Sequence, residues 1–417
     1  MPASNEAMIL VVGSGGQAYR EYLLAGARAH RPVWLLDSTE PTWQRPFVRG
    51  ATVVELIDRT RLIPDQEALV KAALTLAEQH PIAGVWTYDE TLVVATAHIA
   101  ETLGLPGLSV AGAENCRNKE RTRRLLTEAE LPQPRFRYAT SLDEVRAAAL
   151  EFGFPVVLKP RGMGASIGVM RADDEAALSH AYEVAERGSH GGNPAYEGGV
   201  LVEEMLVGPE ISVDGAIVAG EYKPFVLARK QVGLEPYFEE TGHVVDAADP
   251  LLCDGPLLDV LTRAHRALGI RDGITHTEVK LTSAGPAIVE VNGRLGGGLI
   301  PYVGKLATGI DPALVAIQVA TGQEPSLTAT VKDCVGIRFG YPPQDGRVRE
   351  VEAPRSGPGL VEAAVLTTPG ALLLLPPRGI VPRFGYAICR GEGPDACAAA
   401  LDAAEASFTL TLDPIGE

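Results

Sequence analysis

Residues 274–300 read ITHTEVKLTSAGPAIVEVNGRLGGGLI. Apolar and polar residues alternate over 275–281 and again over 287–292, which predicts two short strands. The Ser-Ala-Gly-Pro sequence between them supplies turn residues, so the two strands are expected to form a hairpin. A glycine-rich loop follows directly, and the rest of the chain is expected to be arranged around this unit.

A hairpin that turns at Ala284 makes Glu278 and Glu290 cross-strand neighbours, and the period of two places Asn292 on the same face as Glu290. Two adjacent carboxylates repel each other unless a proton or a cation lies between them. Mg²⁺ takes oxygen ligands, needs few protein carboxylates and completes its shell with water and phosphates. The pair therefore predicts a magnesium and phosphate site.

Arg294 follows Asn292 by two residues, where a guanidinium can hold a phosphate or a developing oxyanion. A simpler interpretation of the hairpin also stands, because its polar residues alternate with Ala287, Val289 and Val291. In that case the polar side chains form only the solvent face of an amphipathic hairpin.

The composition indicates a globular protein with several cores. The chain has 417 residues, 46% hydrophobic and 22% charged, which predicts two to four domains. Its formal net charge is 37 minus 53, or −16, and it lacks a basic arm, so nucleic acid is not an expected partner. No apolar run of membrane-spanning length and no secretory signal is found, so we expect a cytoplasmic protein without a membrane partner. Five scattered cysteines predict reduced thiols.

The first hundred residues alternate strand and helix patterns, which predicts an α/β unit with a doubly wound parallel sheet. Gly13, Gly15 and Ala18 match the dinucleotide fingerprint, and Asp37 ends the second strand. The glycines equally fit a tight strand-to-helix turn without a ligand. Strands are expected at 8–12, 32–37, 52–56 and 83–88, and helices near 19–30, 65–79 and 90–103.

Two further charged positions stand near strand or helix ends. Asp89 and Glu90 follow a strand at the ligand-facing edge of such a sheet, or serve as ordinary first-turn acids of a helix. A charged amphipathic helix is expected over 115–131, and Lys119 within it is, in isolation, one more exposed charge.

A second glycine-rich segment, FPVVLKPRGMGASIGV, spans residues 154–169. An apolar strand ends at Lys159, and the loop after it contains Gly164 and Ser166. Backbone N–H groups of such a loop bind phosphate oxygens while the lysine adds a point charge. It is not a Walker A loop, because G-x-x-x-x-G-K-[ST] occurs nowhere in the chain.

Acidic strand ends follow a loop expected over 189–199. One strand ends at Glu203 and Glu204, and Glu210 begins a further pair of strands. These carboxylates suit hydrogen bonds to an adenine edge and to ribose hydroxyls, or they face solvent. Residues 232–250 are expected to be irregular and substrate-facing, since they mix aromatic and acidic residues.

The order of these motifs is more specific than any one of them. Lys119, the LKPRGMGAS loop, VLVEEMLVGPEISVDG and the series from Glu278 to Arg294 resemble the ATP-grasp superfamily and, within it, the dipeptide-forming L-amino acid ligases. The resemblance implies a mixed α/β, α+β in part, ATP-grasp fold in four parts. These are a pre-ATP-grasp domain at 1–112, a small lid subdomain at 113–200, a large subdomain at 201–328 and a mostly antiparallel C-terminal lobe at 329–417, in which no chemistry stands out.

The resemblance implies an ATP-dependent carboxylate–amine ligase that forms an amide or dipeptide bond through an acyl phosphate and releases ADP and phosphate. Arg294 would stabilise the acyl phosphate and the tetrahedral intermediate. Glu240 and His243 would lie near the amino acid substrates, although His243 alone also fits a structural histidine. Mg²⁺, with Mn²⁺ as an alternative ion, would be held by Glu278, Glu290 and Asn292, and ATP by Lys119, Lys159, Gly164, Ser166, Glu203, Glu204, Leu206 and Glu210.

The implied partners are a small-molecule carboxylate and an amine, with amino acids as the first expectation, and a homodimer is compatible with this class. Members of the branch can carry a bulky aromatic residue a few positions after the arginine. Here Leu295 and Leu299 flank three glycines instead. This departure suggests a roomier second pocket.

Three alternatives stay open. The fingerprint at Gly13 would suit an NAD(P)-dependent oxidoreductase, although that leaves the LKPRGMGAS loop and the hairpin unexplained. A non-catalytic nucleotide-binding protein could keep the same fold. A carboxylase-like or purine-pathway ligase of the same superfamily would require bicarbonate or a different acceptor.

Overall fold

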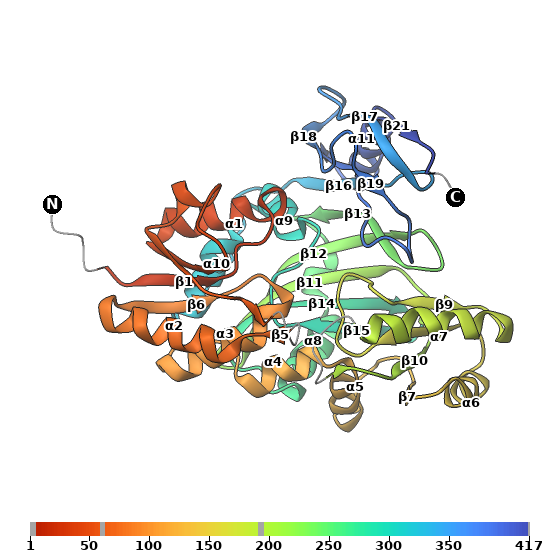
Figure 1. Ribbon diagram of the computed structural model, residues 1–417, viewed down its shortest axis with the longest axis horizontal. Helices are drawn as coiled ribbons and strands as arrows, with labels where there is room; N and C mark the ends of the chain where they lie inside the picture. The colour runs from red at the N-terminus through yellow and green to blue at the C-terminus, as the bar shows by residue number, and fades with distance from the viewer. Residues whose placement is uncertain (1–5, 59–62, 191–195, 416–417) are drawn as a thin grey trace.

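The computed structural model describes residues 6–58, 63–190 and 196–415. Figure 1 shows an N-terminal α/β unit on one side of a large sheet, a smaller sheet with covering helices on the other side, and a C-terminal lobe above them. The predicted mixed α/β fold is confirmed. Residues 191–195 of the loop expected over 189–199 lie outside the described residues.

The N-terminal unit is a parallel sheet with strand order β3-β2-β1-β6, as the alternating pattern predicts. Its first strand is buried along its whole length, which requires cover on both faces. Helices connect the strands and provide that cover. The elements are β1 (Met8–Val12), α1 (Gln17–His30), β2 (Val33–Asp37), β3 (Gly50–Val53), α2 (Gln66–Gln79), β6 (Ile82–Trp86) and α3 (Val93–Leu103).

The helix expected over 115–131 is two helices with a sharp break between them. α4 (Val110–Arg117) ends where Asn118 takes an extended backbone, and α5 (Lys119–Glu128) begins there. The Asn118 side chain accepts hydrogen bonds from the backbone N–H groups of Glu120 and Arg121, which caps α5. The break turns Lys119 inward, so the expectation of an exposed charge is wrong.

The lid subdomain is a four-stranded antiparallel sheet with order β7-β10-β8-β9. Two helices pack on one face of it through small apolar residues. Ser141 caps the start of α6, because its hydroxyl accepts from the backbone N–H of Glu144. The elements are β7 (Phe136–Ala139), α6 (Leu142–Phe152), β8 (Val156–Pro160), β9 (Met170–Ala172), α7 (Glu175–Ser189) and β10 (Val200–Glu204).

The large sheet has eight antiparallel strands in the order β15-β14-β11-β12-β13-β16-β20-β18. The strand pair expected from residue 207 is one strand, β11, because Gly215 stays within it at a bulge opposite β12. The opening hairpin is confirmed as the β14–β15 pair at one edge. The first five strands are β11 (Glu210–Val218), β12 (Glu221–Gly233), β13 (Glu239–Asp246), β14 (Gly273–Thr282) and β15 (Gly285–Asn292), with α8 (Gly255–Ala267) following β13.

The expectation of an irregular stretch over 232–250 is wrong for its middle, which is the strand β13. Gly242 weakens the strand signal in the sequence, yet the packing requires it. A Cβ atom at this position would lie 2.5 Å from the carbonyl oxygen of Ile337 on the neighbouring strand. A residue that looks like a loop former therefore permits close approach between two central strands.

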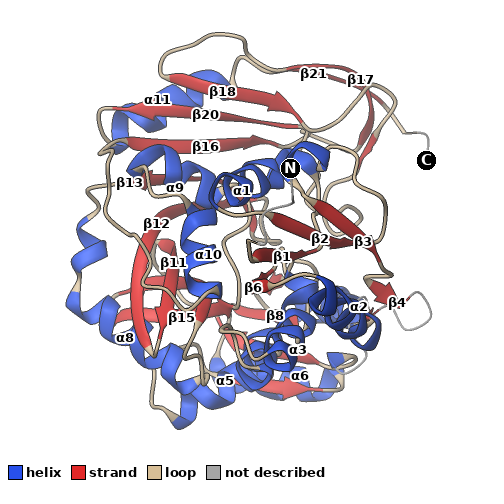
Figure 2. Cartoon of the chain, turned by 90° about the vertical axis from the view of Figure 1, so that its left-hand side faces the viewer, coloured by secondary structure: helices blue, strands red, loops and turns tan. Residues whose placement is uncertain are grey.

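The C-terminal lobe is an extension of the large sheet as well as a separate small one. β16 pairs with β13, and β20 and β18 continue the same sheet, while a three-stranded sheet has the order β19-β17-β21. Figure 2 shows these strands rising continuously from the central sheet. The elements are β16 (Cys334–Gly340), β17 (Gly346–Glu352), β18 (Leu360–Val365), β19 (Leu372–Leu373), β20 (Gly385–Gly391), α11 (Pro394–Glu405) and β21 (Thr409–Asp413).

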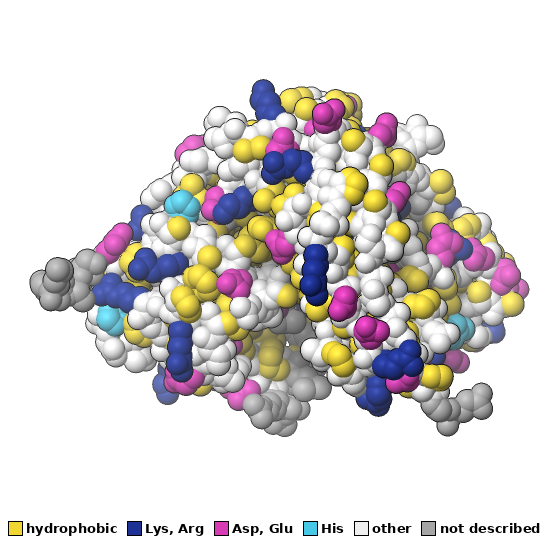
Figure 3. All heavy atoms as spheres, turned by 90° about the horizontal axis from the view of Figure 1, so that it is seen from above, with side chains coloured by type: hydrophobic (Ala, Val, Ile, Leu, Met, Phe, Trp, Pro, Cys, Tyr) yellow, Lys and Arg dark blue, Asp and Glu magenta, His cyan; other side chains and the backbone are white. Residues whose placement is uncertain are grey.

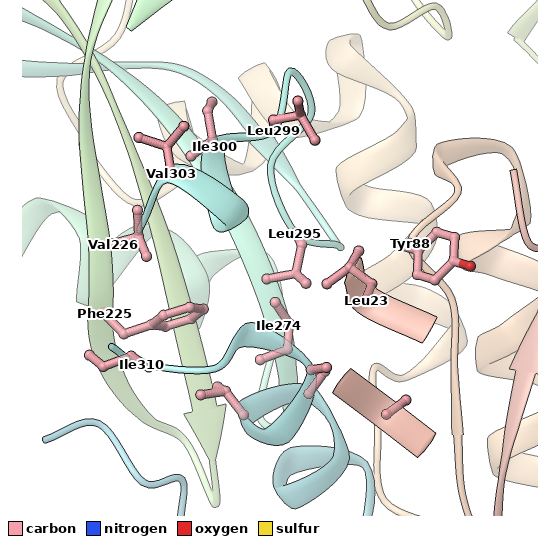
Figure 4. Close-up of a cluster of buried hydrophobic side chains, with 14 of the residues drawn as sticks. Leu23, Tyr88, Phe225, Val226, Ile274, Leu295, Leu299, Ile300, Val303 and Ile310 are labelled. Carbon is pink, nitrogen blue, oxygen red and sulfur yellow. The ribbon is translucent and has the colours of Figure 1, made fainter. Parts of the chain in front are cut away.

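The N-terminal unit and the large sheet share one hydrophobic core. Figure 4 shows Leu23 and Tyr88 from the N-terminal unit facing Leu295 and Ile274 from the hairpin region. Two helices after the hairpin, α9 (Ile300–Thr308) and α10 (Pro312–Ala320), complete this core. The N-terminal unit is therefore fixed against the large sheet by apolar packing, which holds its loops at the edge of the site.

No single helix among the described residues is long and apolar enough to span a membrane. The bent pair α9 and α10 has the combined length and apolar composition of a membrane span, but both helices lie in the shared core. Figure 3 shows basic and acidic side chains interspersed over one face of the molecule, so this face carries no extended basic patch.

Candidate active site

One cavity of about 280 Å³ lies between the lid and the large sheet. Its wall includes the predicted catalytic, metal-binding and ATP-binding residues and one of the two predicted substrate-binding residues. His243 is the one predicted residue that does not line it. The predicted residues in the wall are Lys119, Lys159, Gly164, Ser166, Glu203, Glu204, Leu206, Glu210, Glu240, Glu278, Glu290, Asn292 and Arg294.

The hairpin brings the predicted metal-binding residues together. Glu278 pairs directly with Glu290, and Asn292 pairs with His276, so the predicted cross-strand geometry is confirmed. Glu278 accepts from Lys230 at 2.6 Å, and Glu290 accepts from Lys119 at 3.0 Å. Burial opposes the charged form of Glu278, but Lys230 and His276 keep its pKa well below the ordinary value.

This donor set fits Mg²⁺. Two carboxylates and the amide of Asn292 are oxygen donors, and lysines already compensate the negative charge. Among the described residues no three His, Cys, Asp or Glu side chains converge as a closed metal cage. Mg²⁺ uses few protein ligands when phosphates and water supply the rest, so a closed cage is not expected here.

The lid loop is held over the cavity at three points. Lys119, which is 8% exposed, donates to the carbonyl oxygen of Met163 at 2.5 Å. Arg117 donates to the carbonyl oxygen of Gly162 at 2.9 Å, and Ser166 donates to the carbonyl oxygen of Phe238 at 3.1 Å. Lys119 therefore connects the loop to Glu290 in the hairpin.

Glu203 lies at the centre of a fully paired buried cluster. Its two carboxylate oxygens accept from Arg123 at 2.7 Å and from Lys159 at 2.6 Å. Burial opposes its charged form, but Arg123 and Lys159 lower its pKa to about 2. Burial in turn lowers the pKa of Lys159. Glu204, the next residue, instead pairs with the exposed Arg135 at 2.5 Å.

Lys230 links the predicted ribose residue to the predicted metal residue. It lies on β12 and donates to Glu210 at 2.8 Å and to Glu278 at 2.6 Å. Although burial opposes its charge, the surrounding carboxylates raise its pKa well above the ordinary value. No sequence pattern indicates a role for this lysine, because its partners lie 20 and 48 residues away.

A second group of residues lies where β13 meets the C-terminal lobe. His243 is fully buried, and its Nδ1 atom lies 2.7 Å from the Glu240 carboxylate, while its Nε2 atom has no partner among the described residues. Burial lowers the pKa of His243. Burial opposes the charge of Glu240, but His243 and Lys230 lower its pKa to about 2.

Arg383 closes this group from the C-terminal lobe. Its guanidinium donates to the carbonyl oxygen of Glu240 at 2.8 Å and to the Tyr341 hydroxyl at 3.0 Å, and it stacks over the Phe339 ring. A Cβ atom at Gly298 would lie 3.2 Å from Glu240 and 3.7 Å from Arg383. No chemistry stands out in the sequence of the C-terminal lobe, but the structure brings its Arg383 to the cavity wall.

The N-terminal unit reaches the site through Glu90. This carboxylate pairs with Arg294 at 2.5 Å and with Arg117 at 2.6 Å. Burial opposes its charged form, but the two guanidiniums lower its pKa to about 2. The edge position of Glu90 after β6 signals such a role in the sequence. The contact with Arg294 depends on how the two units pack.

A buried pair supports the glycine loop behind Arg294. Asp214 lies 2.7 Å from His276 and accepts from the backbone N–H of Gly296 at 3.3 Å. Burial opposes the charge of His276, but Asp214 and Glu278 raise its pKa to about 9. Any side chain at Gly296 would meet the His276 ring at 2.9 Å. Packing therefore requires a glycine at position 296, and the neighbouring glycines leave space in the pocket.

Three family models match the chain in order. The ATP-grasp N-terminal domain matches residues 39–107, the ATP-grasp domain matches 152–301, and the L-amino acid ligase C-terminal domain 2 matches 338–413. The last match lies in the lobe that carries Arg383.

Relatives agree with these matches. The chain is 29% identical over 274 residues to the alanine–anticapsin ligase of Bacillus subtilis, covering 61% of this chain and 57% of that protein. It is 30% identical over 246 residues to the D-alanine–D-alanine ligase of Desulforudis audaxviator, covering 55% and 77%. The L-amino acid ligase from Bacillus licheniformis has the same fold, with a TM-score of 0.79, 23% identity, and coverage of 98% and 100%.

The chain belongs to the ATP-grasp superfamily, and it is an ATP-dependent ligase of the C–N bond-forming kind. Its C-terminal domain matches that of the L-amino acid ligases. The chain spans a little more than half the length of the alanine–anticapsin ligase.

Proposed function

We propose that this ligase joins the carboxylate of one amino acid to the amine of another, through an acyl phosphate, with ADP and phosphate as the other products. The observation that carries the proposal is the convergence of two lysines, the Glu278–Glu290 pair, Arg294 and the Glu240 carboxylate on one cavity. A single cavity thus offers groups for phosphates, a metal ion, a developing oxyanion and an ammonium group.

The nucleotide half of the proposal assigns phosphate contacts to Lys119, Lys159 and the loop at Gly164 and Ser166. Both lysines pair with carboxylates that lie on the cavity wall. These pairs hold the two cations in place before ATP binds, which limits reorganisation during phosphoryl transfer. Glu204, Leu206 and Glu210 then line the end of the cavity proposed for adenine and ribose.

Glu278, Glu290 and Asn292 would hold Mg²⁺, which supplies charge neutralisation at the ATP phosphates when bound. Mn²⁺ is the alternative ion for the same oxygen donors.

The chain's own residues account for the remaining requirements. The donor carboxylate attacks the γ-phosphate of ATP, and Arg294 stabilises the negative charge that develops on the acyl phosphate and in the tetrahedral intermediate. Glu240, held ionised by its neighbours, binds the donor ammonium group. The lid loop, fixed by Lys119, Arg117 and Ser166, keeps water from the acyl phosphate.

Product analysis tests this proposal directly. Pairs of amino acids and other carboxylic acids are incubated with ATP and Mg²⁺, and ADP, phosphate and condensation products are measured by mass spectrometry. We expect ADP release only when a carboxylate and an amine are both present. Hydroxylamine added in place of the amine should trap the acyl phosphate as a hydroxamate. Release of AMP and pyrophosphate, or bicarbonate-dependent turnover, would contradict the proposal.

A further inference from the structure

A second cavity, of about 890 Å³, lies between the N-terminal unit and the lid. Five residues border both cavities, which places them between the two: Met163, Gly164, Ala165, Arg294 and Gly297. The part beyond Arg294 is bordered by the Gly15–Gly16 turn, Tyr88 and Arg20. Gly15 belongs to the fingerprint at the start of the chain, but no sequence motif assigned a role to Arg20.

Arg20 is an unpaired cation in the wall of this second cavity. Its guanidinium has no hydrogen bond and no ion pair with the described residues. It stacks over the Tyr88 ring, 5.1 Å from the ring centroid. Burial lowers its pKa, and the positive charge of Arg294 lowers it further. Half-buried guanidiniums normally find a carboxylate or carbonyl partner, because leaving one unpaired is costly.

Acidic residues that include Asp65, Glu67 and Asp89 also line this cavity, and the Asp89 charge favours the charged form of Arg20, but none forms an ion pair with it among the described residues. Glu90 is already shared by Arg117 and Arg294, so these three groups together keep one excess positive charge. The Asp89 carboxylate accepts from the backbone and hydroxyl of Thr91. The start of α1 adds backbone N–H groups without a capping side chain or a first-turn acid. The part of the wall at Arg20 and the start of α1 is therefore suited to a negatively charged group.

We propose that Arg20 binds the carboxylate of the acceptor amino acid, and hence the C-terminal carboxylate of the dipeptide product, in the cavity beyond Arg294. The inference rests on the proposed ligase function and specifies its second substrate as an α-amino acid with a free carboxylate. Arg294 lies at the junction of the two cavities, where the acyl group would be attacked. An α-amino acid carries its carboxylate one carbon from the attacking nitrogen, so that carboxylate faces the Arg20 side of the junction.

The assignment explains two features that the nucleotide site leaves unexplained. The apolar packing between the N-terminal unit and the large sheet fixes α1, and α1 carries Arg20. The glycines after Arg294 keep side-chain bulk out of the boundary between the cavities, since Gly297 borders both and a Cβ there would meet nothing within 4 Å. An acceptor side chain can therefore occupy the large cavity while its carboxylate is held by Arg20.

Acceptor selectivity tests the proposal. The acceptor found in the product screen is compared with its carboxamide in the wild type and in Arg20→Ala, Arg20→Lys and Arg28→Ala. Arg28 lies exposed on the same helix and controls for the loss of one positive charge. We expect Arg20→Ala to raise the acceptor KM by about 10- to 100-fold, the range for a lost charge-assisted hydrogen bond. The KM values for ATP and donor should stay unchanged, and Arg20→Lys should recover part of the loss.

The carboxamide supplies the decisive comparison. Wild type should use it as poorly as Arg20→Ala uses the free acid, and Arg20→Ala should no longer distinguish acid from amide. A wild type that accepts both equally, or an Arg20→Ala variant that keeps the preference, would overturn the assignment.

A measurement without turnover separates this inference from the ligase proposal. Phenylglyoxal labels Arg20 in the intact protein, and labelling is read by peptide mass spectrometry. L-alanyl-L-alanine with ADP should protect Arg20, whereas L-alanyl-L-alanine amide and inorganic phosphate should not. Protection without ligase activity would leave the carboxylate site standing while the ligase proposal fails. Equal labelling under all conditions would overturn the carboxylate site.

Discussion

Buried charged and polar groups are fully paired in the region proposed for the nucleotide, and some are unpaired in the region proposed for the substrates. At the nucleotide end, both oxygens of Glu203 are bound by Arg123 and Lys159. Near the proposed substrate site, the Nε2 atom of the buried His243 has no partner among the described residues, and Arg20 in the second cavity has no anionic partner there. A buried ion pair that is complete fixes geometry, whereas an incomplete one is available to a ligand. Fully paired buried charges are thus expected in the scaffold, and unpaired buried polar groups are expected near the proposed substrate site.

The largest expected effect follows from removing groups that act only during the reaction. Arg294→Ala and Glu290→Gln should each lower kcat/KM by about 1,000-fold or more, because charge at the transferring groups is no longer stabilised. Urea unfolding should change little for Arg294→Ala, since Glu90 keeps its pair with Arg117. Steady-state ADP release and denaturation curves measure both. Ligase turnover near the wild-type level in either variant would show that the residue is wrongly assigned.

Glu203→Gln should instead act on stability, since it leaves two buried cations incompletely compensated. The loss should be about 3–5 kcal/mol in the free energy of unfolding, the range for one removed partner of a buried pair. The pKa of Glu203 is lowered from 4.5 to about 2 on folding, so its ionisation favours the folded state. Its contribution is fully present above pH 4.5 and is lost as the pH falls through about 2.

Urea unfolding of wild type and Glu203→Gln between pH 7 and 2 measures this dependence. The difference between the two proteins should shrink as the pH falls from 4.5 to 2. A difference that is constant over this range would contradict the paired state of Glu203.

Local pattern was sufficient for the parts of the site that come from one segment. Alternation over the hairpin predicts the Glu278–Glu290 pair, and the structure has that pair. The strand ending at Lys159 and the glycine loop after it were equally readable, because strand, lysine and loop are contiguous in the chain. The order of these segments then indicates the fold of the whole molecule.

The local sequence pattern did not predict the role of residues whose partners are distant in the chain. Lys230 and Arg383 are ordinary charges in the sequence. The pairing of β12 with β11 brings Lys230 to the cavity, and the pairing of β13 with β16 and of β16 with β20 brings Arg383 there. Lys119 looked exposed because the break at Asn118 has no apolar signal. In β13, Gly242 obscured a strand that the close approach of Ile337 requires.

A smaller effect is expected at the boundary between scaffold and substrate site. Arg383→Gln keeps a donor for the carbonyl of Glu240 but loses the charge and the stacking over Phe339. The donor KM should rise by about 10-fold, since Glu240 would be held less firmly, while the KM for ATP stays constant. Initial rates with varied donor and varied ATP measure the two separately. An equal rise in both KM values would place Arg383 in the scaffold rather than the substrate site.

The smallest expected effect on stability is that of replacing Glu204, which follows Glu203 on β10. It allows a buried pair to be compared directly with an exposed one. Glu204→Gln should change the free energy of unfolding by about 0.5 kcal/mol or less, since its partner Arg135 is 54% exposed and water already solvates the pair. The two variants remove the same charge one position apart on β10, and they differ in whether the partner cations are buried. Parallel urea titrations of both variants measure that difference. A large loss for Glu204→Gln would mean that position on the strand, rather than burial of the partners, sets the cost.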